Sequence, residues 1–364
     1  MKTIFNGALK LIIICYAILA FQTCKKESQI QPQTSEENIA LQSPQQFSLS
    51  SSYIVSTLVS GLNSNNLPKV QFPYHICSAA DGTLYVSSPN AGGLIYKITQ
   101  QGKVSRLPNL DSPYGIKAGA NGSVYLTRIT FSSDIGSIVK IDKNNVVTTI
   151  PASVTFANPA DLAIAPDSTI YVADELNNRI VKITKQGNTT IFAGKTGQIG
   201  LVDGQGGNAR FSYPSNIRYA NDGILWVVDG NGVSTGGQTI RKITLDGKVT
   251  TFYKLAPSQQ SFINDLAVTN RDKNFNISPH ENAFISITRS SPSDTSSLTQ
   301  RKYQILHLSY DKVLTPITSL LTEGFQDGPA AQATFRGPTG LTVNPGGIFV
   351  ADLSNNAIRK ITRK

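Results

Sequence analysis

Histidine and cysteine are scarce in this sequence of 364 residues, which contains three of each. The histidines are His75, His280 and His307, and they lie in an apolar run, a long polar stretch and a separate predicted strand. A zinc site needs about three nitrogen, sulfur or oxygen ligands, so these histidines are not expected to form one together. The sequence also lacks a Cys-x-x-Cys pair, a Gly-x-Ser-x-Gly motif, a phosphate-binding loop and an HExxH motif, which excludes the enzyme classes that those motifs mark.

Acidic residues are absent from the N-terminal segment. Residues 1–10 carry two lysines, and residues 11–21 form an unbroken apolar run, LIIICYAILAF. This run is too short to span a bilayer as a helix, which needs about 20 residues, and is typical of a secretion signal. Cys24 follows the run and resembles the acylated cysteine of bacterial lipoprotein signals, although Phe21 and Thr23 depart from the usual Leu and small residue. An ordinary cleaved signal with a chance cysteine is the alternative.

These features divide the chain into a lipoprotein signal peptide (1–23), a flexible tether (24–46) and a folded domain (47–364). The tether is rich in Gln, Ser, Glu and Pro and lacks the apolar residues that a core needs. Lipidation of Cys24 predicts attachment to a membrane of the cell envelope, as an outer-membrane lipoprotein facing the periplasm or the cell surface. Cys77 is then the one thiol of the mature chain, so no internal disulfide is expected, and we predict that it is a core residue.

Basic residues outnumber acidic ones. The formal net charge is +10, and removal of the signal with its two lysines lowers it to +8. A basic surface favours anionic partners. The basic residues are scattered, however, and no basic run is interleaved with aromatic residues. Nucleic acid is therefore not expected as a partner.

A pattern recurs six times along the chain. Each unit begins near a proline, has an aliphatic residue three positions later, passes a turn such as Asp-Gly or Asn-Gly, and reaches an aromatic residue followed by an aliphatic one. The six segments are FPYHICSAADGTLYVSS (72–88), SPYGIKAGANGSVYLTR (112–128), NPADLAIAPDSTIYVAD (158–174), YPSNIRYANDGILWVVD (213–229), FINDLAVTNRDK continuing to AFISIT (262–288), and GPTGLTVNPGGIFVAD (337–352). In the fifth unit Ile263 stands where the proline is expected.

Two further strands are predicted in each unit. The third ends in a basic residue followed by an aliphatic one, and a turn leads from it to a fourth. The basic-aliphatic pairs are Lys97-Ile98, Lys140-Ile141, Lys182-Ile183, Lys242-Ile243, His307-Leu308 and Lys360-Ile361. Short alternating strands separated by Gly, Asn and Asp turns predict antiparallel hairpins. Four strands in each of six units indicate an all-β protein, a six-bladed β-propeller.

The sixth unit ends at Lys364 without a fourth strand. The segment SYIVSTLVSG (52–61) has the pattern of the missing strand. We predict that this N-terminal strand completes the last blade and closes the ring. Closure removes an exposed sheet edge, which is the physical reason for such an arrangement.

The repeats resemble the NHL-repeat family. The closest matches are DLAIAPDSTIYVADELNNRIVKI (161–183) and GLTVNPGGIFVADLSNNAIRKI (340–361), and the interblade segments DGQGGNARF (203–211) and DGPAAQATF (327–335) are also typical of extracytoplasmic NHL proteins. The resemblance covers residues 53–364. Blade five departs from it by two polar insertions, 271–282 and 289–302, which are either surface loops or a lid or partner-binding loop.

Candidate ligand-binding residues stand two positions after each proline, where the innermost strand begins near one mouth of a central channel. They are His75, Gly115, Asp161, Asn216, Asp265 and Gly340. One His, one Asn and two Asp that converge on an axis can hold a calcium-like divalent ion or a polar ligand. Alternatively, the Asp and Asn side chains satisfy local backbone groups. Asp174, Asp229 and Asp352 share one place after the second strand, which predicts a structural role in turns.

Three enzyme types use related propellers. Peptidyl-hydroxyglycine amidating lyases hold zinc through histidines next to the proline, and the residues here at that place are Tyr74, Tyr114, Ala160, Ser215, Asn264 and Thr339. That zinc site is therefore not expected. Gluconolactonase-like propellers hold a divalent ion through Glu, Asn and Asp, of which only Asn and Asp are found at the inner-strand starts. Virginiamycin-lyase-like propellers use a catalytic His, a role that His75 alone does not establish.

The sequence therefore predicts a non-enzymatic binding or scaffold module without a resident cofactor. We expect it to act as a monomer and to hold a protein, peptide or glycan ligand. The alternative is a metal-dependent hydrolase or lyase acting at the channel mouth through His75, Asp161, Asn216 and Asp265.

Overall fold

The computed structural model describes residues 52–61, 69–130, 133–230, 238–255, 261–269, 282–289 and 301–364. The predicted signal, lipidation site and tether lie outside these residues, as do most of the two polar insertions predicted in blade five. Within the described ranges, no helix has the length and apolar character needed to cross a membrane.

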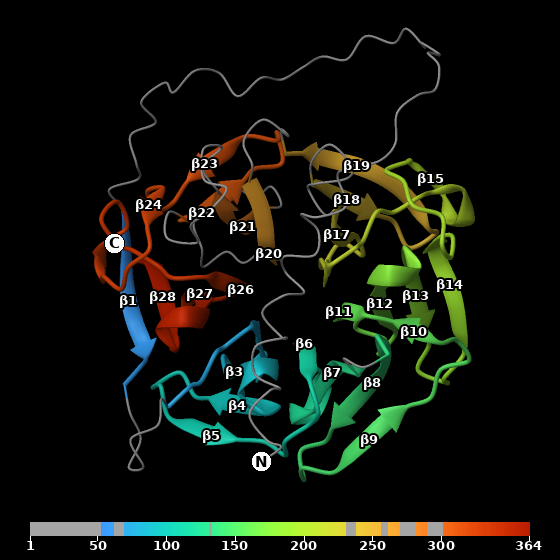
Figure 1. Ribbon diagram of the computed structural model, residues 1–364, viewed down its shortest axis with the longest axis horizontal. Coiled ribbons are helices and arrows are strands. Elements are labelled where there is room, and N and C mark those ends of the chain that lie inside the picture. Colours follow the sequence, from blue (N-terminus) through green and yellow to red (C-terminus); the bar gives the residue numbers. More distant parts are fainter. Residues whose placement is uncertain are drawn as a thin grey trace, which may run out of the picture. The chain divides into compact units, whose positions relative to one another are not determined.

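Six antiparallel sheets surround one axis, as predicted, and each is a blade of a β-propeller (Figure 1). The first three strands of each blade follow one another outward from the centre in chain order, and in blades one to five the fourth strand continues this order. In blade six the N-terminal strand β1 takes the fourth place. Blades one to three contain β2 His75–Ser78, β3 Leu84–Ser88, β4 Leu94–Ile98 and β5 Val104–Arg106; β6 Pro113–Ala118, β7 Val124–Thr130, β8 Ile135–Ile141, β9 Val147–Ile150 and β10 Phe156–Ala157; and β11 Pro159–Ile164, β12 Ile170–Asp174, β13 Arg179–Ile183 and β14 Thr189–Gly194.

The other three blades each carry an additional two-residue strand, as blade two does with β10. They contain β15 Gly204–Gln205, β16 Asn216–Tyr219, β17 Leu225–Asp229, β18 Thr239–Ile243 and β19 Lys248–Lys254; β20 Ser261–Thr269, β21 Asn282–Arg289, β22 Lys302–Leu308, β23 Leu314–Pro316 and β24 Leu321–Thr322; and β25 Gly328–Pro329, β26 Pro338–Asn344, β27 Gly347–Asp352, β28 Ala357–Arg363 and β1 Tyr53–Val59. The described residues also include the short 3-10 helices η1 Pro89–Ala91, η2 Ala120–Gly122, η3 Glu175–Asn177, η4 Gly206–Asn208 and η8 Leu353–Asn355.

Cross-strand pairing explains the two most regular features of the repeat. The aromatic residue of each second strand lies directly opposite the basic residue of each third strand. The six pairs are Tyr85 with Lys97, Tyr125 with Lys140, Tyr171 with Lys182, Trp226 with Lys242, Phe284 with His307 and Phe349 with Lys360. The ammonium of Lys242 lies 4.1 Å from the ring centroid of Trp226 and 4.2 Å from that of Phe252. Such cation–π pairs stabilise neighbouring strands.

The apolar core consists of six clusters, each of which lies between two consecutive blades. Leu341 of blade six packs with Phe284 of blade five, for example, and Phe349 of blade six packs with Ile76 of blade one. Cys77 is buried in the cluster between blades one and two and is a free thiol, as predicted for a core residue. No blade buries its apolar faces alone, so the blades depend on one another.

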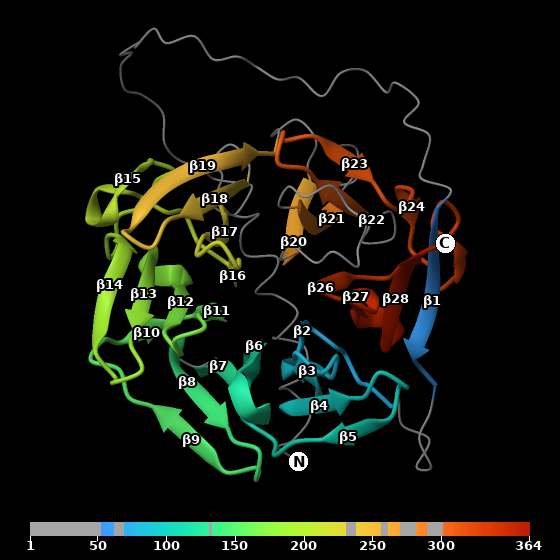
Figure 2. The same ribbon diagram turned by 180° about the vertical axis from the view of Figure 1, so that it is seen from behind.

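The N-terminal strand closes the ring. β1 pairs antiparallel with β28, with Ile54 opposite Thr362 and Thr57 opposite Arg359, and both Figure 1 and Figure 2 show it at the outer edge of blade six. Val55 joins the cluster between blades five and six, and Val59 joins the cluster between blades six and one. The predicted closure is therefore confirmed.

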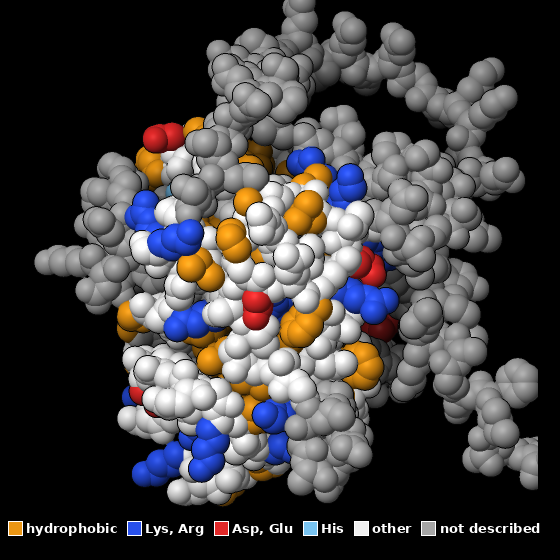
Figure 3. All heavy atoms as spheres, turned by 90° about the vertical axis from the view of Figure 1, so that its left-hand side faces the viewer, with side chains coloured by type: hydrophobic (Ala, Val, Ile, Leu, Met, Phe, Trp, Pro, Cys, Tyr) orange, Lys and Arg blue, Asp and Glu red, His pale blue; other side chains and the backbone are white. Residues whose placement is uncertain are grey.

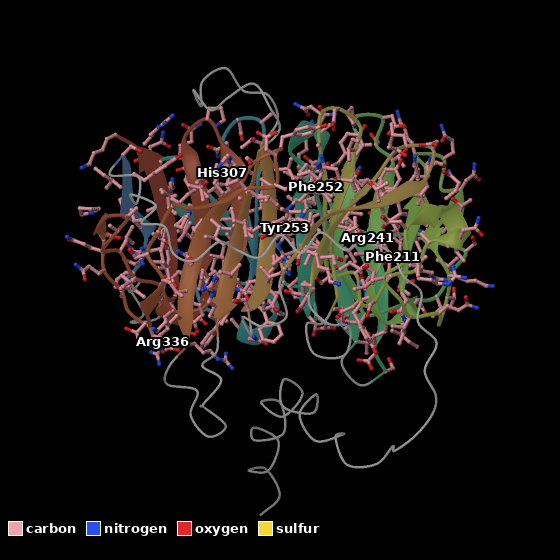
Figure 4. The ribbon with its side chains drawn as sticks, turned by 90° about the horizontal axis from the view of Figure 1, so that it is seen from above. Phe211, Arg241, Phe252, Tyr253, His307 and Arg336 are labelled. Carbon is pink, nitrogen blue, oxygen red and sulfur yellow. The ribbon has the colours of Figure 1, made fainter. Side chains whose placement is uncertain are left out.

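Buried aspartate–arginine pairs anchor three blades. Asp174, Asp229 and Asp352 each accept a backbone N–H, and they form ion pairs with Arg179 at 2.7 Å, Arg241 at 2.9 Å and Arg359 at 3.0 Å. The structural role predicted for these carboxylates is confirmed, and it includes ion pairing as well as backbone bonding. Figure 4 shows Arg241 next to Phe211, and its guanidinium carbon lies 5.4 Å from the centroid of that ring.

The closing strand repeats an internal contact. In blade four, Asp203 accepts hydrogen bonds from Thr251 and pairs with Arg241. In blade six, Asp327 accepts the same bonds from Thr57 and pairs with Arg359. Thr57 on the N-terminal strand thus takes the place of Thr251, which is the contact expected if β1 is the fourth strand of its blade.

The side of the ring at the left of Figure 1, where β1 and β28 of blade six lie, faces the viewer in Figure 3. Lys and Arg side chains are scattered over this side among apolar and neutral groups, and they do not gather in one patch. The positive net charge of the chain therefore does not create one concentrated anion-binding surface on this side.

We predict that removal of β1 destabilises the propeller far more than removal of the residues before it. A chain that starts at Gly61 lacks the strand pairing of β1 and the buried side chains Val55 and Val59. Burial of each valine contributes about 1.5–3 kcal/mol to the free energy of unfolding. The Tm of the shortened chain is expected to fall by roughly 10 °C or more relative to a chain that starts at Ser52. Equal melting temperatures of the two chains, measured by circular dichroism, would contradict ring closure by β1.

Candidate functional site

The inner strands of all blades begin at one face of the ring, which we call the proline face after the five prolines that start the units: Pro73, Pro113, Pro159, Pro214 and Pro338. Equivalent residues of neighbouring blades touch there. The hydroxyls of Tyr74 and Tyr114 are 2.7 Å apart, and Thr339 Oγ1 donates to the carbonyl of Tyr74 at 2.9 Å. The residues two places after the prolines lie just inside this face.

Four charged side chains form a buried cluster around the axis, the axial charge cluster: Lys117, Asp161, Arg218 and Asp265. Lys117 Nζ lies 2.9 Å from Asp161 Oδ1. Arg218 bridges the two carboxylates, with Nη1 on Asp161 Oδ2 and Nη2 on Asp265 Oδ1. Both carboxylates are fully buried, and the Lys117 and Arg218 side chains are only 12% and 11% exposed. Two positive and two negative charges therefore neutralise one another at the axis.

The predicted ligand-binding residues Asp161, Asn216 and Asp265 are brought together, but their oxygens are engaged. Asn216 Nδ2 donates to Asp265 Oδ1 at 3.1 Å, in addition to the bonds from Arg218. A divalent ion would have to displace the Lys117 ammonium or the Arg218 guanidinium. The donor set thus does not fit a calcium site, and across the described ranges no three His, Cys, Asp or Glu side chains are grouped to hold a metal.

The axial carboxylates also link neighbouring blades through the backbone. Asp161 of blade three accepts the Ile217 N–H of blade four at 3.3 Å, and Asp265 of blade five accepts the Leu341 N–H of blade six at 2.7 Å. The strands approach closely here, since a Cβ on Gly115 would lie 2.6 Å from Asp161 Oδ1. The alternative interpretation from sequence, in which these side chains satisfy backbone groups, is therefore part of their role.

Opposing effects set the protonation of the axial cluster. Burial raises the pKa of Asp161, but Lys117 and Arg218 outweigh it and bring the pKa to about 2. Burial dominates for Asp265 and raises its pKa in spite of Arg218. Burial lowers the pKa of Lys117, and the nearby positive charge of Arg218 lowers it further.

His75 is buried beside this cluster and is held neutral. It is 3% exposed, and its ring centroid lies 5.0 Å from that of Tyr74 and 5.1 Å from that of Tyr114. Burial lowers the pKa of His75 to about 3, and Lys117 lowers it as well. Nδ1 has no hydrogen-bond partner within the described part of the chain. His75 is therefore a neutral, buried ring whose Nδ1 is not hydrogen-bonded to any described residue.

The other histidine in the described residues is not part of this site. His307 packs against Phe284 in blade five, with ring centroids 5.4 Å apart. Figure 4 shows the ring edge-on and places His307 toward one face and Arg336, which precedes Pro338, toward the other. The prediction that His307 does not meet His75 is confirmed, whereas His280 lies outside the described residues.

A second titratable group lies at the proline face. Glu175 follows β12 directly and is half-buried, and its Oε2 accepts a hydrogen bond from Asn158 Nδ2 at 2.7 Å. Burial and the nearby Asp134 raise the pKa of Glu175 to about 7. Burial is also the main cause that raises the pKa values of Tyr74 and Tyr114, and the charge of Glu175 raises both further. Glu175 was not predicted from the sequence, because it occurs in one blade only and follows Asp174, whose place in the repeat predicted a structural role.

Lys117 and Arg218 were also missed, although a signal for them exists. Each lies two positions after a candidate axial residue on the same strand, and side chains two apart on a strand share a face. The alternation of the inner strands therefore places both cations on the axial side. Which carboxylate each of them meets depends on the order of the blades.

We predict that Asp161→Ala strongly destabilises the protein. The substitution leaves the buried cations Lys117 and Arg218 with a single axial carboxylate, and breaking such a buried pair costs about 3–5 kcal/mol. Urea denaturation measures this loss, and Asp311→Ala, which alters an exposed carboxylate, is the control. A calcium-dependent rise in Tm that disappears in Asp161→Ala would contradict the assignment of these oxygens to Lys117 and Arg218.

We also predict that His75 makes the protein less stable in mild acid. An unfolded histidine is protonated below about pH 6.5 whereas folded His75 stays neutral to about pH 3, so the unfolded state binds more protons between these values. The free energy of unfolding therefore decreases as the pH is lowered through this range, by up to about 1.4 kcal/mol per pH unit.

The raised pKa of Glu175 acts in the opposite direction between about pH 4.5 and 7, so the informative quantity is the difference from His75→Gln. Urea denaturation at pH 7, 6 and 5 should show that this variant loses less stability than the wild type over that interval. Parallel pH dependence in the two proteins would show that His75 is not held neutral.

Comparison with solved structures places the chain among propellers. One similar structure is a protein of unknown function from Bacteroides thetaiotaomicron, with 17% identity and a TM-score of 0.60 over 86% of this chain and 76% of that one. A second is a catalytically inactive histidine-to-alanine variant of virginiamycin B lyase from Staphylococcus aureus with quinupristin, with 16% identity and a TM-score of 0.53 over 85% of this chain and 99% of that one. A third is a gluconolactonase from Xanthomonas campestris, with 12% identity and a TM-score of 0.53 over 85% of this chain and 89% of that one. At these identities the likeness establishes the fold alone. None of the curated proteins compared with the sequence matches it.

The family comparison is more specific. The model described as the virginiamycin B lyase family matches residues 58–262, which include the axial charge cluster apart from Asp265. The NHL type of the repeats remains a prediction, since the family that matches is one of the three related enzyme types considered from sequence. The match covers more than half of the chain, and the chain therefore belongs to the virginiamycin B lyase family.

Proposed function

We propose that this protein is an envelope-anchored binding module that holds a protein, peptide or glycan ligand at its proline face. A lipid on Cys24 would anchor it to the outer membrane, and residues 24–46 would serve as the tether. The observation that carries the proposal is the pairing of Tyr74 and Tyr114, two half-buried rings from neighbouring blades with joined hydroxyls. Tyrosine offers an apolar surface together with a hydroxyl, which suits reversible binding.

The axial charge cluster favours binding over metal-dependent hydrolysis. Its two carboxylates are neutralised by Lys117 and Arg218, so that they are poorly suited to act as metal ligands or bases. His75 is neutral, but it lies within this paired environment and has no acid partner of its own among the described side chains. The arrangement supports a rigid ring in which the axial charge cluster stabilises the fold and the proline face binds the ligand.

The binding proposal predicts a ligand-dependent gain in stability. A ligand that binds only the folded state raises the free energy of unfolding by about 2.7 kcal/mol at a hundred times its Kd, which corresponds to a rise in Tm of several degrees. We expect such a rise with a soluble polysaccharide or an unstructured peptide digest of casein, followed by differential scanning fluorimetry. The rise should disappear in Tyr114→Ala and persist in the surface control Asp311→Ala. No rise with either class of probe would reject the proposal.

A lyase is the second candidate, favoured by the family and by Glu175. A carboxyl group with a pKa near 7 can act as a general base close to neutral pH. In an elimination, Glu175 would remove a proton next to a carbonyl carbon, and the leaving oxygen would take a proton from the hydroxyl of Tyr74 or Tyr114. This reaction needs no metal at the axial carboxylates.

Turnover separates the two candidates. Under the binding proposal, quinupristin and gluconolactone remain unchanged when incubated with the mature chain and followed by mass spectrometry. Cleavage of either compound that rises with an inflection near pH 7 and is lost in Glu175→Gln would establish the enzyme and reject a purely binding role.

A further inference from the structure

The residue before each of the five prolines at the proline face has a left-handed backbone. These residues are Phe72 (φ 42°), Ser112 (φ 50°), Asn158 (φ 49°), Tyr213 (φ 63°) and Gly337 (φ 76°). The repetition in five blades shows that the fold itself requires this conformation where the chain enters an inner strand.

Neighbouring blades hold two of these residues in place. Asn356 Oδ1 of blade six accepts the Phe72 N–H at 2.8 Å, and Asn178 Oδ1 of blade three accepts the Tyr213 N–H at 3.1 Å. The two sites are equivalent, and both asparagines are themselves left-handed. The backbone bond does not depend on the side chain at position 72 or 213.

Gly and Asn tolerate a positive φ, whereas a bulky side chain there is a genuine outlier. Blades three and six accordingly use Asn158 and Gly337. Phe72 and Tyr213 accept the strain without a compensating gain from packing, since neither belongs to an apolar cluster of the described chain. Phe72 is 45% exposed, and Tyr213 is partly exposed. Strain of this kind is typical of functional sites.

Four aromatic residues stand next to prolines of the proline face, in three different blades. Phe72 and Tyr74 belong to blade one, Tyr114 to blade two and Tyr213 to blade four, and blades one and four lie on opposite sides of the ring (Figure 2). A ligand that uses all four must be extended. Flat rings with hydroxyls suit the C–H faces and hydroxyl groups of sugars, and the half-buried carboxylate of Glu175 adds an acceptor for a sugar hydroxyl.

We propose that the ligand is a carbohydrate chain that lies across the proline face and stacks on Phe72 and Tyr213. This inference rests on the proposed binding function and names its ligand class. It assigns a ligand-binding role to two residues that the fold would accommodate more easily as Asn or Gly.

The test uses substitutions that relieve strain. Phe72→Asn and Tyr213→Asn place the residue of blade three at the same position, so Tm should be unchanged or higher. Ser112→Asn is the matched control, because it makes the same change at the equivalent left-handed position without removing a ring. Affinity electrophoresis in gels containing laminarin, xylan or glucomannan measures binding. We expect at least one polysaccharide to retard the wild type and Ser112→Asn alike, and each aromatic variant to bind it up to about tenfold more weakly.

Two results would overturn the inference and leave the binding function intact. The first is retardation of Phe72→Asn and Tyr213→Asn equal to that of the wild type. The second is no retardation by any polysaccharide together with a Tyr114-dependent rise in Tm on adding the casein digest, which would identify a peptide ligand. If neither probe class binds the wild type, both the inference and the proposed function fail.

Discussion

Apolar packing between neighbouring blades is the constraint on which this structure depends. Every apolar cluster lies between two blades, so each blade is stable only when both of its neighbours are present. In an open array of such blades, the first and last blades would each expose an apolar face, and closing the array into a ring covers both faces. Closure requires that the first and last strands of the domain pair, and β1 meets this requirement by supplying Val55 and Val59 to the clusters on both sides of blade six.

Closure has an electrostatic consequence at the axis. Six inner strands converge there, and the charged side chains that they carry lose contact with water. Buried charges are tolerated when they are paired and hydrogen-bonded, and Lys117, Asp161, Arg218 and Asp265 meet this condition collectively. The same burial keeps His75 neutral. The charges at the centre of the ring thus neutralise one another, and the proline face remains as the surface at which a ligand can bind.

The proline face is free of this restriction and combines the features that a ligand can use. Tyr74 and Tyr114 join two blades through their hydroxyls, Glu175 has a pKa near neutrality, and Phe72 accepts backbone strain while its ring remains exposed. Membership of a lyase family favours an enzyme, whereas the pairing of the axial carboxylates within the described chain favours a binding module. Either function would use this face. The fold supplies the platform in either case.

The sequence alone determined the fold, because strand alternation and turn residues act over a few positions. The repeat predicted six blades, the aromatic and basic positions and the closing strand, and it placed Asp161, Asn216 and Asp265 at the starts of inner strands. Only the tertiary structure decided that Arg218 would bridge Asp161 and Asp265, which lie 57 and 47 positions away along the chain. Pairing of this kind depends on which strands become neighbours around the axis. A local sequence pattern does not indicate which distant residues of the chain lie close together in the folded protein. For the same reason Glu175, which lies in a connection between strands, could be assigned to the face of Tyr74 and Tyr114 only after the ring had closed.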